Sequence, residues 1–152
     1  MSVYWIPNLL VLLGAPRTQQ NRDLLMSWWA WEGGNGGPRG DVKPSAKYNW
    51  LNTTTKVLGS KNFNVLNPAT GSGVQNYPTY LSGLHATNKT LRKPEYAGIV
   101  LALKTGTPLK PKPSPFLVSG LSIWVSGKPD STIGLAYADR VIKLALRYEK
   151  VR

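Results

Sequence analysis

The 152-residue chain contains no cysteine and a single histidine, His85. Without cysteine the protein cannot build a disulfide framework, a thiol nucleophile or a cysteine metal site, and one histidine cannot form a multi-histidine site. We therefore expect neither a metal nor another cofactor. The sequence also lacks the G-x-S-x-G pattern of a serine nucleophile elbow, so His85 is not expected to serve in a Ser-His-Asp triad.

Acidic residues are scarce, because 7 Asp+Glu stand against 19 Lys+Arg and give a formal net charge of +12. A charge of this size attracts polyanions, a class that includes nucleic acid, anionic lipid and acidic cell-wall polymers. Charge alone does not choose among these partners. Part of it forms a stripe at spacings of three and four residues near the end of the chain: Arg140, Lys143, Arg147 and Lys150.

Long apolar runs are absent as well. The stretch 3–15 is too short to span a bilayer, and no basic residue precedes it as in a signal peptide. We expect it to form a core helix that stops at Gly14. At 16.7 kDa the chain suits one compact domain, residues 1–152, without a transmembrane span.

Hydrophobic periodicity predicts a mainly α fold of the α+β kind. Helices are expected at 18–32, 79–92, 95–104 and 133–149, and a strand or short helix at 117–125. The predicted face of 79–92 consists of Tyr80, Leu81, Leu84 and Leu91. Residues 33–77 lack strong periodicity and are expected to form a loop with short strands, and a stretch of this kind is more often functional or disordered than structural filler. The Lys-Pro run at 108–115 predicts an extended connector.

The stretch LLMSWWAWEGG at 24–34 places one acid, Glu32, at the end of an aromatic helix. Glu32 lies three and four residues after Trp29 and Trp28, so its side chain is expected to share a face with indole rings. Desolvation there raises the pKa of a carboxyl group and keeps its proton available for general acid catalysis. A glutamate at a helix end is, however, ordinarily solvated. We expect at least two of Trp28, Trp29 and Trp31 to be buried and the remainder to be available for stacking on sugars.

Several short stretches follow one another in an order that is more specific than any one of them. They are LLGAPRT at 12–18, WAWEGG at 29–34, NWLNTT at 49–54, GVQNYPTY at 73–80, GLHATNKTL at 83–91 and YAGIVLALKTG at 96–106. In this order the chain resembles phage and actinobacterial cell-wall hydrolases with a lysozyme-like fold. The resemblance covers residues 9–106 and leaves 107–152 outside.

The resemblance implies a lysozyme-like helical domain with a long irregular segment in its middle. It also implies that Glu32 faces a cleft for the alternating amino sugars of peptidoglycan. A glycosidic oxygen cannot leave as an unprotonated alkoxide, which is why such a site needs a proton donor. The expected activity is that of a muramidase, a glucosaminidase or a lytic transglycosylase with Glu32 as the general acid.

Candidate substrate-binding residues follow Glu32 along the chain. Asn52, Thr53 and Thr54 carry short side chains suited to sugar hydroxyl and N-acetyl groups, although such residues ordinarily cap turns. By resemblance to lysozyme-like glucosaminidases, Tyr77 shapes the subsite for the scissile bond. The sequence alone equally allows Tyr77 to pack against the next helix. Gln75 is a weaker candidate.

Asp41, nine residues after Glu32, is the candidate for a second catalytic carboxylate. The spacing is similar to that of phage-type lysozymes, but the surrounding PRGDVKPS does not match their motif and an RGD in a Gly-Pro loop is ordinarily exposed. The separation of the two carboxyl groups decides the mechanism, and a sequence does not contain it. Without a nearby second acid, a lytic transglycosylase is expected, in which Glu32 acts as both acid and base.

Three functions remain open at this point. The first is a peptidoglycan hydrolase that binds glycan strands and acidic wall polymers, acting from a phage tail, beside other tail proteins, or released at the host wall. The second is a non-catalytic virion protein that keeps the lysozyme-like fold for wall binding. The third, a basic nucleic-acid-binding protein, lacks any recognised motif and ranks last.

Overall fold

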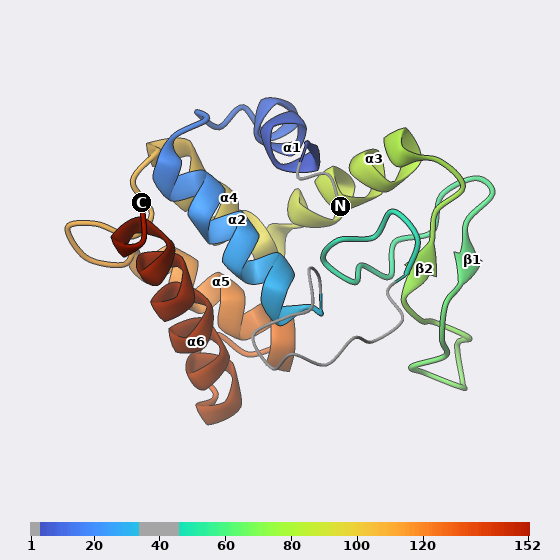
Figure 1. The fold of residues 1–152 in the computed structure, drawn as a ribbon. Coiled ribbons are helices and arrows are strands. Elements are labelled where there is room, and N and C mark those ends of the chain that lie inside the picture. Colours follow the sequence, from blue (N-terminus) through green and yellow to red (C-terminus); the bar gives the residue numbers. More distant parts are fainter. Residues whose placement is uncertain (1–3, 34–45) are drawn as a thin grey trace. The chain divides into compact units, whose positions relative to one another are not determined.

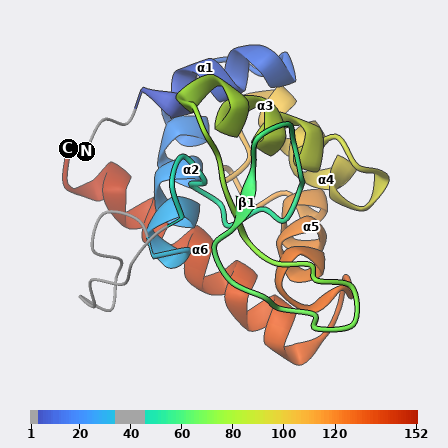
Figure 2. The same cartoon turned by 90° about the vertical axis from the view of Figure 1, so that its right-hand side faces the viewer.

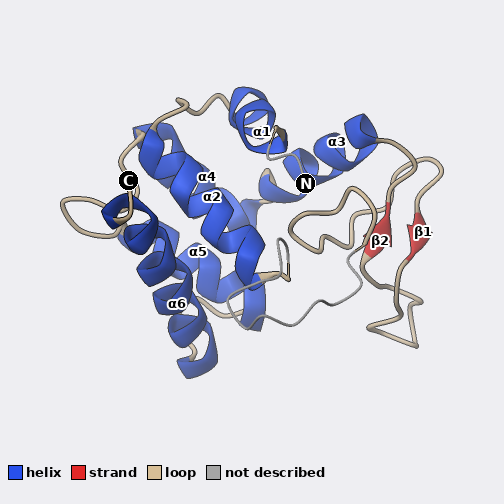
Figure 3. Ribbon diagram, in the orientation of Figure 1, coloured by secondary structure: helices blue, strands red, loops and turns tan. Residues whose placement is uncertain are grey.

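The computed structural model describes residues 4–33 and 46–152 and confirms a mainly helical fold (Figure 1). Helices dominate, and the strands are confined to one short hairpin (Figure 3). In the described residues the elements are α1 (Trp5–Leu13), α2 (Gln19–Trp31), β1 (Lys61–Asn62), β2 (Gln75–Asn76), α3 (Tyr80–Leu91), the 3-10 turn η2 (Pro94–Tyr96), α4 (Ala97–Thr105), α5 (Pro115–Ser126) and α6 (Thr132–Lys150).

Contacts within the chain divide it into two compact units. The first comprises residues 29–90, and the second comprises residues 2–28 together with 91–152. The boundaries fall inside α2 and near the end of α3, so both units contain parts of these helices. The expectation of a single domain stays a prediction. Across residues 4–33 and 46–152, every helix is too short or too polar to cross a membrane.

The second unit is a helical assembly in which α5 and α6 lie side by side (Figure 1, Figure 2). Trp124 of α5 holds two aromatic neighbours, the Trp28 ring at 4.8 Å and the Tyr96 ring at 5.0 Å. Gly120 lets α5 approach α4, because a Cβ at that position would lie 2.4 Å from Ile99 Cγ1. Residues 115–126 form a helix, so the stretch 117–125, for which the sequence allowed a strand or a short helix, is helical.

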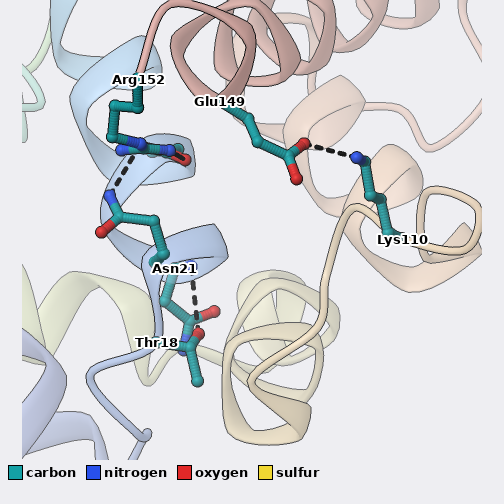
Figure 4. Close-up of polar contacts among 7 residues, drawn as sticks. Thr18, Asn21, Lys110, Glu149 and Arg152 are labelled. Carbon is teal, nitrogen blue, oxygen red and sulfur yellow. Dashed lines mark hydrogen bonds and ion pairs between the residues drawn. The ribbon is translucent and has the colours of Figure 1, made fainter.

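In the second unit, polar side chains form hydrogen bonds and ion pairs around the start of α2 (Figure 4). The Thr18 hydroxyl accepts a hydrogen bond from the Asn21 amide N–H at 3.3 Å, which confirms Thr18 as the start of the helix. The Arg152 guanidinium pairs with the buried carboxylate of Asp23, and Lys110 pairs with Glu149 at 2.5 Å. The raised pKa of Arg152 has the hydrogen bond to Asp23 as its main cause.

Two local predictions are wrong. Residues 108–115 are not extended, because the amide of Ser114 donates to the Pro108 carbonyl at 2.9 Å and the segment turns back on itself. Leu81 is 58% exposed instead of packing in the core. The buried face of α3 begins after Leu81, and it contains small residues beside two leucines. Its members are Gly83, Leu84, Ala86, Thr87, Thr90 and Leu91.

The first unit contains the irregular segment, the β1–β2 hairpin and most of α3. The two strands pair antiparallel, with Lys61 opposite Asn76 and Asn62 opposite Gln75. The chain before the hairpin runs along β2, since the Gln75 amide donates to the Thr53 carbonyl and the Tyr77 amide donates to the Lys47 carbonyl. This alignment positions residues 47–55, which carry the candidate site.

Gly83 is where α3 meets residues 47–55 most closely. A Cβ at Gly83 would lie 2.1 Å from the Tyr48 carbonyl oxygen, which is backbone and cannot rotate away. We expect Gly83→Ala to lower the free energy of unfolding by about 1–3 kcal/mol, as overpacking does. Urea unfolding measures the change. His85→Ala, at an exposed position of the same helix, is the control, and equal stabilities of the two variants would contradict the close approach.

Candidate active site around Glu32

Glu32 follows directly after Trp31, the last residue of α2, and its side chain is half-buried. The expected desolvation is thus partial. Trp28 and Trp29 are 0% and 3% exposed, which confirms burial of two of the three indoles, while Trp31 is half-buried. Gly33 turns the chain with φ at +95°, a conformation that a residue with a side chain rarely adopts.

Asn52 holds the Glu32 side chain. Its Nδ2 group donates to Glu32 Oε2 at 2.9 Å and to the Glu32 carbonyl oxygen at 2.9 Å. An amide NH₂ has two hydrogens, so one group can make both bonds at once. Asn52 itself has φ at +55°, and asparagine is among the few residues that tolerate this left-handed conformation. The LNTT stretch thus reaches the EGG stretch through one side chain.

Asn49 shapes the turn that carries Asn52. Its Oδ1 accepts the Thr53 amide N–H at 2.8 Å, and its Nδ2 donates to the carbonyl oxygens of Thr53 and Gln75, each at 2.8 Å. The side chain is 4% exposed, so all three bonds lie out of water. Asn49 was not among the predicted site residues. The signal available for it was an asparagine four residues before a threonine, which is typical of side chains that bond to nearby backbone.

Tyr77, directly after β2, fastens the same turn. Its hydroxyl donates to the Thr55 carbonyl at 2.8 Å and lies 2.7 Å from the Thr53 hydroxyl. A phenol has one hydrogen, so the Thr53 hydroxyl donates to the tyrosine oxygen. Burial raises the pKa of Tyr77 above its ordinary value of 10.0, and the hydrogen bond from Thr53 opposes part of that rise.

Gln75 is bonded within the hairpin. Its Nε2 donates to Asn62 Oδ1 at 2.6 Å and to the Gly73 carbonyl at 2.9 Å, while its Oε1 accepts from the Ser60 hydroxyl at 3.1 Å. The residue is 1% exposed. Both ends of its amide therefore belong to the hairpin.

The structure separates the predicted substrate-binding residues into two groups. Thr53, Gln75 and Tyr77 are buried at 2%, 1% and 1% exposure, and their polar groups bond to the unit that contains them. They position the turn and the hairpin, and they present almost no surface to a substrate. Asn52 is half-buried and Thr54 is exposed, so contact with a substrate stays a prediction for these two. Asp41 lies outside the described residues.

The charge of the described part of the first unit is one-sided. Residues 46–90 contain no acid and four lysines, all of them exposed: Lys47, Lys56, Lys61 and Lys89. In the described part of the first unit, Glu32 is therefore the only carboxylate side chain. Such an excess of positive charge favours anionic ligands.

Tyr77→Phe tests the buried hydroxyl network. The variant leaves the Thr53 hydroxyl and the Thr55 carbonyl without their partner, and we expect a loss of about 1–3 kcal/mol in the free energy of unfolding. The pH dependence has a definite sign. An unfolded tyrosine ionises near its ordinary pKa while the folded Tyr77 keeps its proton, so this contribution is complete below pH 10 and is lost as the pH rises above it.

The measurement is chemical unfolding of the wild type and Tyr77→Phe at neutral pH and above pH 10. The variant should lose less stability between the two conditions than the wild type. Some loss remains in both, because burial also raises the pKa of Tyr96 and Tyr148. Equal losses would show that Tyr77 titrates alike in the folded and unfolded chains.

Comparisons of the chain with protein-family models, with curated proteins and with solved structures found no match. The assignment of a function therefore depends on the residues and on the geometry described above.

Proposed function

We propose that the protein cleaves the glycan strands of peptidoglycan, with Glu32 as the proton donor. The observation that carries the proposal is the pair of hydrogen bonds from Asn52 to Glu32. These bonds join two of the sequence stretches behind the lysozyme-like resemblance, and Tyr77, from a third, bonds to Thr53 and Thr55 beside Asn52. Local sequence does not require the three stretches to meet around one carboxyl group.

The chemistry follows from the position of the Asn52 amide. Because its N–H donates to Oε2, the proton of the neutral carboxylic acid is favoured on Oε1. A carboxyl group oriented in this way protonates the glycosidic oxygen as the bond to the sugar carbon breaks. Orientation matters here since a misplacement of about 1 Å costs on the order of 100-fold in rate.

A second acid decides between two outcomes for the same proton donor. If Asp41 activates water, the enzyme is a hydrolase. If Glu32 works alone, it takes the proton back from a hydroxyl group of the substrate, which attacks in place of water and leaves a 1,6-anhydro sugar. Mass spectrometry of the products distinguishes the two, because the anhydro end is one water lighter.

The Asp41→Asn variant tests the same choice between hydrolase and transglycosylase by its rate. In a hydrolase that uses Asp41, we expect the variant to lose about 100-fold or more in rate, the usual contribution of a general base. In a transglycosylase its rate stays close to that of the wild type. The product mass and the rate of the variant must indicate the same mechanism. A hydrolytic product together with a fully active Asp41→Asn variant would contradict a role for Asp41.

Positive charge supports an anionic wall as the place of action. The α6 stripe of Arg140, Lys143, Arg147 and Lys150 is exposed along its length, although Lys143 also pairs with Asp139 at 2.8 Å. Acidic wall polymers would hold such a protein on its substrate, either as part of a phage tail, beside other tail proteins, or after release at the host wall.

The experiment that tests the proposal is incubation of the full chain with purified sacculi. We expect soluble muropeptides in the supernatant of the wild type. Sedimentation of the protein with sacculi, and its binding to DNA, are measured alongside. Binding to sacculi without release would favour a non-catalytic virion protein, and a preference for DNA would favour a nucleic-acid-binding protein.

A further inference from the structure

Backbone strain in the described residues is concentrated next to Asn52. Among residues 4–33 and 46–152, two non-glycine residues have positive φ: Tyr48 at +52° and Asn52 at +55°. Asparagine adopts this region readily, but for a tyrosine it is strained. Such strain persists only where the surroundings enforce it, and it is commonest at ligand-binding and catalytic sites.

The backbone on either side of Tyr48 is held from several directions. The Lys47 carbonyl accepts the Tyr77 amide at 2.9 Å, and the Lys47 amide donates to Asn76 Oδ1 at 2.7 Å. Gly83 of α3 admits the Tyr48 carbonyl, which would collide with any larger residue there. The strained conformation is therefore built in by β2 and α3.

The side chains of this segment offer partly exposed aromatic surface. Tyr48 is 37% exposed, and the Lys47 ammonium lies 5.3 Å from the centre of its ring. Trp50 is half-buried and packs edge-on against Tyr80, with the ring centres 5.4 Å apart and an interplanar angle of 71°. Packing fixes Trp50 in place while part of its surface stays open.

We propose that Tyr48 and Trp50, here named the aromatic platform, form a sugar-binding subsite for amino-sugar chains that carry anionic substituents. This inference rests on the proposed function and extends it. Asn52 bonds to Glu32, and Trp50 lies two residues before Asn52 while Tyr48 lies four residues before it. The length of the chain therefore keeps the Cα atom of Trp50 within about 7 Å, and that of Tyr48 within about 14 Å, of the Cα atom of Asn52.

The chemistry of the ligand class matches the platform. Sugar rings present apolar C–H faces that stack on aromatic side chains, and partly exposed tyrosine and tryptophan supply rigid area at little cost in side-chain entropy. Lys47 adds a positive charge beside the Tyr48 ring, suited to the carboxylates of peptide-bearing sugars in peptidoglycan. In this proposal the positive φ of Tyr48 places its ring at the sugar-binding subsite, which accounts for a tyrosine in a strained conformation.

The test uses Glu32→Gln as the parent, so that binding is measured without turnover. Its probes are an N-acetylglucosamine hexamer, by calorimetry, and purified sacculi, by sedimentation. Tyr48→Gly is the central variant, because glycine accepts the positive φ and removes the ring. We expect it to be at least as stable as the parent and to bind the hexamer at least 10-fold more weakly.

Two further variants sharpen the result. Phe63→Ala removes an aromatic ring of similar exposure, 40%, from the hairpin of the same unit, and we expect unchanged binding. Lys47→Gln is expected to weaken binding to sacculi and to leave binding to the uncharged hexamer unchanged. Trp50→Ala should weaken both, provided that its unfolding curve matches the parent.

The failures of the two proposals are distinguishable. If the wild type releases muropeptides and Tyr48→Gly binds the hexamer as tightly as the parent, the aromatic platform is wrong and the proposed function stands. If the parent binds neither probe and the wild type releases nothing, both are wrong. Weakening by Phe63→Ala equal to that by Tyr48→Gly would also overturn the platform, because the effect would not be specific to it.

Discussion

Glu32→Gln is expected to abolish the release of soluble muropeptides from purified sacculi while leaving binding to the same sacculi unchanged. Glutamine has nearly the shape of glutamate, and its side-chain oxygen can still accept the Asn52 N–H that Glu32 Oε2 accepts at 2.9 Å. An amide cannot donate a proton to a departing glycosidic oxygen. Loss of general acid catalysis lowers the rate by about 10²–10⁴-fold, which brings release close to background.

The control for this prediction is Glu95→Gln, the same change at an exposed glutamate of the second unit. It should release muropeptides at the rate of the wild type. Binding is measured by sedimentation with sacculi, and folding by thermal unfolding. A fully active Glu32→Gln variant would refute Glu32 as the proton donor, and inactivity of the wild type itself would refute the enzymatic proposal.

The second large effect is expected from Asn52→Gly. Glycine preserves the backbone, since φ of +55° is easy for it, but removes both hydrogen bonds to Glu32. The carboxyl group then samples orientations that do not reach the glycosidic oxygen. We expect kcat to fall about 10- to 100-fold, because the positioning of the carboxyl group is lost.

A pH profile separates this positioning role from a merely structural one. Asn52 donates to an oxygen of the carboxylate, and a donor of this kind favours the charged form. Its removal should move the alkaline limb of the pH–rate profile of kcat/KM, where Glu32 loses the proton that it donates, to higher pH. Asn52→Asp should move the limb further, because it adds a like charge beside Glu32. Asn67→Gly, at an exposed loop position, is the control with no expected shift.

The helices were largely predictable because their signals are local. Apolar spacing predicted a helix over 18–32, and the structure has α2 at Gln19–Trp31. The same holds for α6, expected at 133–149 and observed at Thr132–Lys150. The prediction that Leu81 is buried was wrong because it rested on the neighbouring leucines, whereas small residues form much of the buried face of α3.

The site was only partly predictable. The sequence singled out Glu32 and Asn52, and the structure joins them by a hydrogen bond. The sequence left open whether Tyr77 would pack inside the protein. It did not indicate that Gln75 would be buried, or that Asn49 would close the turn with three bonds. Those facts depend on β2 lying beside residues 47–55, which are more than 20 positions earlier in the chain.

By itself the sequence determined the helical class, the strong positive charge and the placement of Glu32 at a helix end, because periodicity, composition and chain order act over a few residues. Only the tertiary structure decided which polar side chains hold the turn and which one reaches the carboxyl group. The reason is that a buried polar group must find a partner wherever the folded chain provides one, and at Tyr77 and Asn49 much of that partnership comes from a distant segment.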